Sequence, residues 1–94
     1  MLIERVTIIN KRGLHARAAA KLVTTATPFK ARVLVRIASE NDTNNWVDAK
    51  SVMSLMLLAA TQGTDIEIQT DGQDEHCAME AIRNLIAQRF EEGE

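Results

Sequence analysis

A histidine and an arginine, His15 and Arg17, follow the glycine at position 13. Residues 2–9 have the composition of a strand and the residues after His15 have the spacing of a helix, so we expect His15 at the start of that helix. About four backbone N–H groups at a helix start have no partner within the helix, and the peptide dipoles add about half a positive charge there. An anion at this joint is therefore stabilised.

The chemistry that fits this joint is phosphoryl transfer. Imidazole is largely neutral near neutral pH, and a neutral ring nitrogen is a nucleophile. Attack on phosphorus would leave a phosphoryl group on His15, facing the backbone N–H of Ala16 and the guanidinium of Arg17. Small alanines at positions 16, 18, 19 and 20 would let another protein approach. The alternative is that His15 only caps the helix and Gly13 only supplies a turn with positive φ.

Residues 10–19, Asn-Lys-Arg-Gly-Leu-His-Ala-Arg-Ala-Ala, resemble the active-site segment of the bacterial phosphocarrier family HPr and its nitrogen-branch paralogue NPr. Residues 49–56 resemble the family's regulatory-serine segment, and residues 62–68 resemble its approach to the last strand. The resemblance implies that His15 is phosphorylated on Nδ1 by enzyme I, a phosphoenolpyruvate-dependent kinase, and that Arg17 contacts the phosphate. An EIIA-type protein is the implied acceptor, for sugar uptake or for a regulatory branch.

The chain departs from the family in two places. The family commonly has proline after the arginine, where this chain has Ala18, so the first helical turn is less preorganised. The segment Ser39 to Trp46 is longer than the family pattern. Ser51 is by its type a helix N-cap residue. The resemblance adds a second role, regulatory phosphorylation by an HPr kinase/phosphorylase, which would place negative charge beside a docking surface.

Apolar residues surround the segment from Val52 to Leu58 instead of forming one stripe. A short helix in a small domain cannot bury every side, so either an apolar patch stays exposed for docking or the helix is sunk in the core. The resemblance favours docking through Val52, Met53 and Met56, with Ala20 nearby. A module that binds partners through this patch, without covalent chemistry, is the second functional hypothesis.

Composition limits the remaining possibilities. The 94 residues predict one domain, 1–94, and a net charge of −2 without a basic cluster argues against nucleic acid. The single cysteine, Cys77, favours a reducing cytoplasm, and the longest apolar run is too short to span a membrane. We expect a monomer without metal or cofactor. The resemblance implies a covalent carrier instead of a turnover enzyme. An autonomous hydrolase is disfavoured, because no Ser/His/Asp set or pair of carboxylates forms a recognisable motif.

The order of elements predicts an α+β fold. Strands are expected at residues 2–9, 31–37, 46–47 and 65–70, with helices starting at His15, at Ser51 and after a cap at Asp74, and with the middle helix ending at residues 62–64. Half-polar strands covered by helices indicate two layers around an antiparallel sheet. The family fold is an open-faced β-sandwich of this kind (βαββαβα), with three helices on one face of four strands. His76 is expected at the surface, Cys77 as a packing residue, and Glu91, Glu92 and Glu94 as a solvated tail.

Overall fold

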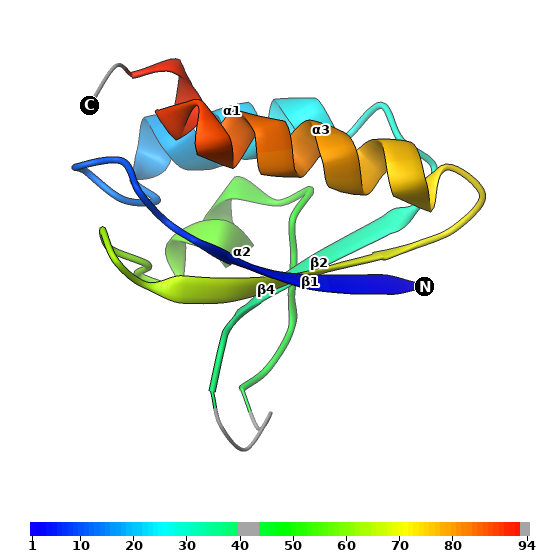
Figure 1. The fold of residues 1–94 in the computed structure, drawn as a ribbon, viewed down its shortest axis with the longest axis horizontal. Helices are drawn as coiled ribbons and strands as arrows, with labels where there is room; N and C mark the ends of the chain where they lie inside the picture. The colour runs from blue at the N-terminus through cyan, green and yellow to red at the C-terminus, as the bar shows by residue number, and fades with distance from the viewer. Residues whose placement is uncertain (40–43, 93–94) are drawn as a thin grey trace.

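The computed structural model describes residues 1–39 and 44–92 and has the predicted layers, a four-stranded antiparallel sheet with three helices. Helices α1 and α3 lie side by side over one face of the sheet (Figure 1). The elements in chain order are β1 (Leu2–Thr7), α1 (Ala16–Ala26), β2 (Arg32–Ile37), β3 (Val47–Asp48), α2 (Val52–Met56), β4 (Asp65–Asp71), α3 (Glu75–Ala87) and the turn η1 (Arg89–Glu91).

The sheet has the strand order β1-β4-β2-β3, and all neighbours are antiparallel. In the register, Val6 and Ile37 both pair with Ile66, so one apolar row crosses three strands towards the helices. Val33 and Val35 on β2 are fully buried on this face. The alternation in the sequence therefore gave the correct face of each long strand, because side chains on a strand alternate between the two faces.

The opposite face of the sheet carries charges in register. Arg5 and Arg36 both pair with Glu67 along the strands. Nε of Arg36 donates to Oε1 of Glu67 at 2.9 Å, and Arg5 lies 3.8 Å from Oε2 of the same residue. The guanidinium of Arg36 also lies 4.1 Å from the ring centroid of Trp46, so this aromatic residue covers a charged side chain on the sheet. Of the long segment before it, residues 40–43 lie outside the described residues.

Helices α1 and α3 supply the other half of the core. The predicted stripe of α1 is confirmed, since Ala19, Leu22 and Ala26 are fully buried and Val23 packs against them. Helix α1 ends at Ala26, just before Pro28, as expected for the residues that precede a proline. The inward residues of α3 are Ala78, Met79, Ile82, Leu85 and Ile86.

Helix α2 is shorter than predicted. It ends at Met56 with a cap at Leu57, so the prediction that it runs to residues 62–64 is wrong. Ala59 has a positive φ of 52°, and the chain after it turns so that the carbonyl of Ala60 accepts a hydrogen bond from Leu14 at 2.9 Å. The residues after Leu57 therefore leave the helix, although their composition is typical of one, because Ala60 hydrogen-bonds to the loop before α1. None of the helices in the described part of the chain is long and apolar enough to cross a bilayer.

Two predictions at the start of α3 need correction. Asp74 occupies the N-cap position, but its side chain does not bond the helix; its carboxylate accepts hydrogen bonds from the backbone N–H groups of Lys30 and Ala31 at 2.9 and 2.8 Å. It therefore ties the turn after α1 to the start of α3. Cys77 is exposed and is not a packing residue, because it lies on the outer side of α3. His76 is exposed, as expected.

We expect Asp74→Asn to lower the free energy of unfolding near neutral pH and to have little effect in strong acid. The hydrogen bond from Lys30 N–H lowers the pKa of Asp74; burial opposes this, and the N–H of Ala31 and the charge of Lys50 add to the lowering. A carboxylate whose pKa is depressed in the folded state stabilises the protein above its unfolded pKa, about 3.9, and this contribution is lost as the pH falls through the folded value. Urea unfolding at pH 7 and at pH 3 measures both differences.

The control is Glu80→Gln, which removes a carboxylate from an exposed position on α3. A difference between Asp74→Asn and the unmodified protein that is as large at pH 3 as at pH 7 would contradict this role for the carboxylate.

Candidate functional site

His15 is the N-cap residue of α1. Its backbone is extended, with φ −76° and ψ 178°, and its carbonyl accepts the first helical hydrogen bond from Ala19 at 2.8 Å. Nδ1 of the ring accepts a hydrogen bond from the backbone N–H of Arg17 at 3.3 Å. The side chain is 19% exposed, so one edge of the ring is within reach of a partner. The structure thus places a ring nitrogen over the first amides of the helix, where anions are stabilised.

The loop before His15 is held by hydrogen bonds on both sides. Gly13 has φ +67°, and its N–H donates to the carbonyl of Asn10 at 3.1 Å. The side-chain amide of Asn10, which is fully buried, donates to the carbonyl of Gly13 at 2.8 Å. The next residue, Leu14, is bonded to Ala60 in the loop after α2. The position of His15 therefore depends on contacts with a segment more than forty residues later in the chain.

Glu92 covers the other ring nitrogen of His15. Its Oε2 contacts Nε2 of the ring at short range, and its Oε1 accepts a hydrogen bond from the amide of Asn10 at 2.9 Å. The prediction that the acidic end is a solvated tail is wrong for Glu92, whose side chain is only 9% exposed; Glu94 lies outside the described residues. No local pattern distinguishes Glu92 from the exposed Glu91, so sequence analysis missed both Glu92 and Asn10 as site residues.

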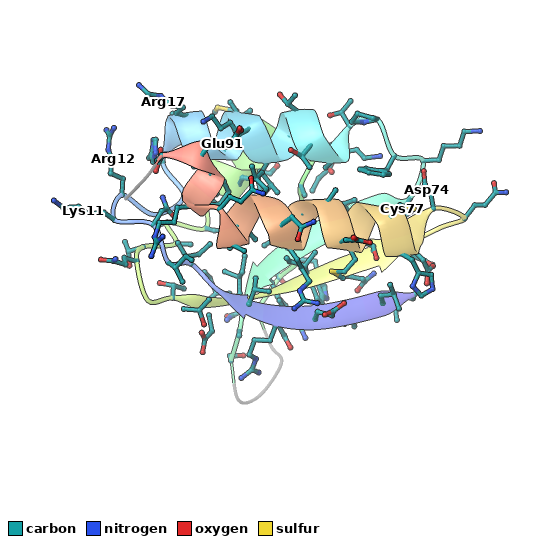
Figure 2. The ribbon with its side chains drawn as sticks, turned by 45° about the horizontal axis from the view of Figure 1, so that its top comes forward. Lys11, Arg12, Arg17, Asp74, Cys77 and Glu91 are labelled. Atoms are coloured by element: carbon teal, nitrogen blue, oxygen red, sulfur yellow. The ribbon has the colours of Figure 1, made fainter. Side chains whose placement is uncertain are left out.

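Basic and acidic side chains line a small cavity next to Glu92, the residue that contacts the ring. The cavity has a volume of about 280 Å³ and is lined by Arg12, Arg17 and Lys21 together with Glu91 and Glu92. Figure 2 shows Arg12, Arg17 and Glu91 at the same end of the molecule, with Asp74 and Cys77 at the other. The ammonium group of Lys21 donates to the carbonyl of Phe90 at 2.7 Å, which fastens the C-terminal turn to α1. Three cationic and two carboxylate side chains give the lining a net charge of +1, which favours an anion such as a phosphoryl group.

The Glu92 carboxylate is held in its ionised form. Burial alone would raise the pKa of Glu92, but hydrogen bonds from His15 and Asn10, together with the nearby positive charge of Arg12, lower it below its ordinary value. The carboxylate is therefore a negative charge at neutral pH, in direct contact with the ring of His15.

The predicted regulatory and docking residues lie on α2 and on the outer side of α1. Ser51 is the N-cap of α2, and its hydroxyl accepts a hydrogen bond from the N–H of Ser54 at 3.3 Å. Met53 is 76% exposed and Met56 is 44% exposed, whereas Val52 packs partly against the core. Leu57, also exposed, extends this apolar surface. Because α2 packs against α1, the methionines and the site belong to one packed unit.

The alanines on either side of Arg17 play different parts. Ala16 and Ala20 are exposed on α1, but Ala18 and Ala19 are fully buried. The expectation that all four admit a partner is therefore wrong for Ala18 and Ala19, which let the helix pack closely on the core.

A second and larger cavity, of about 660 Å³, lies between β1 and α3, and residues of the His15 site do not line it. It is bordered by residues of β1 such as Leu2 and Glu4 and by residues of α3 such as His76 and Arg83. Across residues 1–39 and 44–92, no group of three or more histidine, cysteine or acidic side chains is arranged to hold a metal ion.

Comparison with known proteins identifies the family. Residues 3–88 match the family model described as the PTS HPr component phosphorylation site. The chain is 51% identical over 94 residues to the phosphocarrier protein HPr of Neisseria meningitidis serogroup A, with all of both chains covered. It is 47% identical over 92 residues to that of Xylella fastidiosa, covering 98% of each. A crystal structure of HPr from Thermoanaerobacter tengcongensis superposes with a TM-score of 0.86 at 38% identity, covering 98% of both chains. The family model over residues 3–88 and these relatives, matched over nearly the whole chain, show that the chain belongs to the HPr family of phosphocarrier proteins of the phosphotransferase system.

Proposed function

We propose that this phosphocarrier holds its phosphoryl group on Nδ1 of His15. The observation that carries the proposal is the hydrogen bond from Arg17 N–H to Nδ1, because an acceptor nitrogen has its lone pair available. The lone pair attacks the phosphorus of a phosphorylated donor, the Nδ1–P bond forms, and the bond from phosphorus to the donor breaks with its electron pair left on the donor. The reverse exchange passes the group to an acceptor.

The amides at the start of α1 and the guanidinium of Arg17 would then steady the phosphoryl oxygens. The N–H groups of Ala16 and Arg17 are among the amides at a helix start that have no acceptor within the helix. A helix N-terminus contributes about 0.3–1 kcal/mol to an anion, which orients the group without making it difficult to remove. A carrier needs such weak stabilisation, because the same site must both accept the phosphoryl group and release it.

The partners that fit this chemistry are enzyme I as donor and an EIIA-type protein as acceptor, both acting in the cytoplasm. The exposed apolar surface of Met53, Met56 and Leu57, with Ala20 on the neighbouring helix, supports docking beside the site. Flexible methionines adapt to different partners. The same docking surface would also suit a module that binds partners without covalent chemistry. The family comparison favours the carrier.

Ser51 is a regulatory position in this proposal. Its hydroxyl caps α2 immediately before Val52 and Met53, so a phosphate there would add about −1.5 to −2 charges beside the docking surface. An HPr kinase/phosphorylase would be the modifying partner. The added charge would oppose docking of an acidic partner.

The test is direct phosphorylation. The protein is incubated with enzyme I, phosphoenolpyruvate and Mg²⁺, the ion serving the donor enzyme, and its mass is measured before and after acid treatment. We expect a gain of one phosphoryl group that is lost in acid and that maps to the peptide containing His15, with ³¹P–¹⁵N coupling to Nδ1. No gain, or a group on His76, would overturn the proposal.

We expect Met53→Glu to slow phosphoryl transfer from enzyme I by about tenfold or more, which corresponds to about 1.4 kcal/mol of lost docking energy. Met53 is the more exposed of the two methionines, so the substitution places a charge in the docking surface without touching the core. The rate is measured at subsaturating carrier. Ile3→Glu, at an exposed position on β1, is the matched control. Equal rates for the two variants would show that this surface does not dock the donor.

A further inference from the structure

The two ring nitrogens of His15 face groups of opposite kinds. The N–H of Arg17 can only donate, so Nδ1 must accept. An ionised carboxylate can only accept, so Nε2 in contact with Glu92 must carry a hydrogen. Both contacts are satisfied by the same form of the neutral ring, with its hydrogen on Nε2 and its lone pair on Nδ1.

We propose that Glu92 is a positioning residue that holds the ring hydrogen of His15 on Nε2 and so keeps the lone pair of Nδ1 free for phosphorus. This inference rests on the proposed phosphorylation of Nδ1. A free imidazole exchanges between its two neutral forms, and in one of them Nδ1 carries the hydrogen and cannot attack. Glu92 removes that form from the population.

The carboxylate of Glu92 is itself held in place. The buried amide of Asn10 donates to its Oε1 and to the carbonyl of Gly13, which links the carboxylate to the loop that positions His15. The backbone leading to Glu92 is strained, because Arg89, Phe90 and Glu91 all have φ between 53° and 63°. Non-glycine residues adopt this left-handed conformation at a cost, and it persists where the surroundings enforce it.

Two contacts enforce the turn. The ring of Phe90 is fully buried in the core, and its carbonyl accepts the hydrogen bond from Lys21. The turn η1 therefore directs one residue inward as an anchor and brings Glu92 back over His15. These two contacts hold residues 89–92 against the protein, unlike a segment surrounded by solvent.

The carboxylate also matches the charge that the reaction creates. When the Nδ1–P bond forms, the ring retains its hydrogen on Nε2 and gains a positive charge, which the carboxylate of Glu92 faces directly. When an acceptor nucleophile attacks the phosphorus, the electrons of the Nδ1–P bond return to the ring and neutral imidazole is released. If the ring lost its Nε2 hydrogen, it would be a poorer leaving group. Glu92 opposes this loss.

Glu92→Gln gives a sharp test because Asn10 determines which way the new amide points. The amide hydrogens of Asn10 require the oxygen of the glutamine, so its NH₂ group faces Nε2 and makes Nε2 an acceptor. We expect ¹⁵N NMR of the neutral ring to show the Nε2–H form in the unmodified protein and a shift to the Nδ1–H form in Glu92→Gln. We expect the rate of phosphorylation by enzyme I to fall by at least about tenfold, as for loss of a group that positions a proton.

Glu80→Gln, which makes the same chemical change at an exposed position of α3, is the matched control and should alter neither readout. Glu92→Asp, which keeps the carboxylate, should restore part of the Nε2–H form. Urea unfolding and the amide NMR spectrum show that each variant is folded.

An unchanged ring form in Glu92→Gln overturns the inference, whether or not the rate falls, and so does an unchanged rate with a shifted ring form. The proposed function fails separately, if the unmodified protein is not phosphorylated on His15.

Discussion

Replacement of His15 by alanine should abolish acceptance of the phosphoryl group, leaving no acid-labile mass gain after incubation with enzyme I and phosphoenolpyruvate. In the proposed function the ring nitrogen is the bond-forming atom, and nothing in alanine replaces it. The side chains that remain, such as Arg17 and Lys21, can bind an anion but do not form the Nδ1–P bond. The effect is therefore expected to be complete, below the detection limit of intact-mass measurement.

The matched control is His76→Ala. His76 is the second histidine of the chain and is exposed on α3, next to Cys77 at the end of the molecule opposite Arg12 and Arg17 (Figure 2). Its replacement should leave the mass gain and its rate unchanged. A phosphoryl group that persists in His15→Ala and disappears in His76→Ala would relocate the chemistry.

Replacement of Gly13 by alanine should lower the free energy of unfolding by about 3 kcal/mol or more, a large part of the stability of a domain this size. Two costs add. The φ of +67° is disfavoured for alanine by about 1–2 kcal/mol, and the new Cβ would lie 2.6 Å from the carbonyl oxygen of Ala60 and 2.8 Å from Cα of Thr61. Both are backbone atoms, so relief requires the two loops to separate. Urea unfolding measures the loss.

Gly63→Ala separates the two costs. Gly63 also has a positive φ, +89°, but no atom lies within 4 Å of the position that a Cβ would take. We expect this variant to lose only about 1–2 kcal/mol. If the two variants were equally stable, the close approach of the two loops at Gly13 would not contribute to the loss of stability.

Because the carbonyl of Gly13 also accepts the hydrogen bond from Asn10, we expect Gly13→Ala to slow phosphorylation as well.

The fold was predictable where the pattern is local. Alternation on β2 and β4 identified Val33, Val35, Ile66 and Ile68 as inward residues, and all four are fully buried. The spacing on α1 and the proline after it gave both the buried face and the end of that helix. In each case a short stretch of sequence contains the whole cause, which is the period of the element and the residue that stops it.

Prediction failed where the cause lies far along the chain. Glu92 and His15 are separated by 77 residues, and the buried Phe90, the turn around it and the amide of Asn10 bring them together. Asp74 was assigned to its own helix, but its hydrogen-bond donors are Lys30 and Ala31, more than forty residues earlier. The end of α2 depends on Leu14 in the same way. Helix propensity and capping preference are weak where such tertiary bonds compete with them.

The charged row on the helix-free face of the sheet has a consequence for how copies of the protein meet. Open sheets tend to stack when their free faces are apolar. Here Arg5, Glu67 and Arg36 run across three adjacent strands, so two such faces pressed together would have to bury charged side chains, above all that of Arg5, which is 55% exposed. The sheet face that α1 and α3 leave uncovered thereby discourages aggregation. A carrier that diffuses between partners must stay unaggregated.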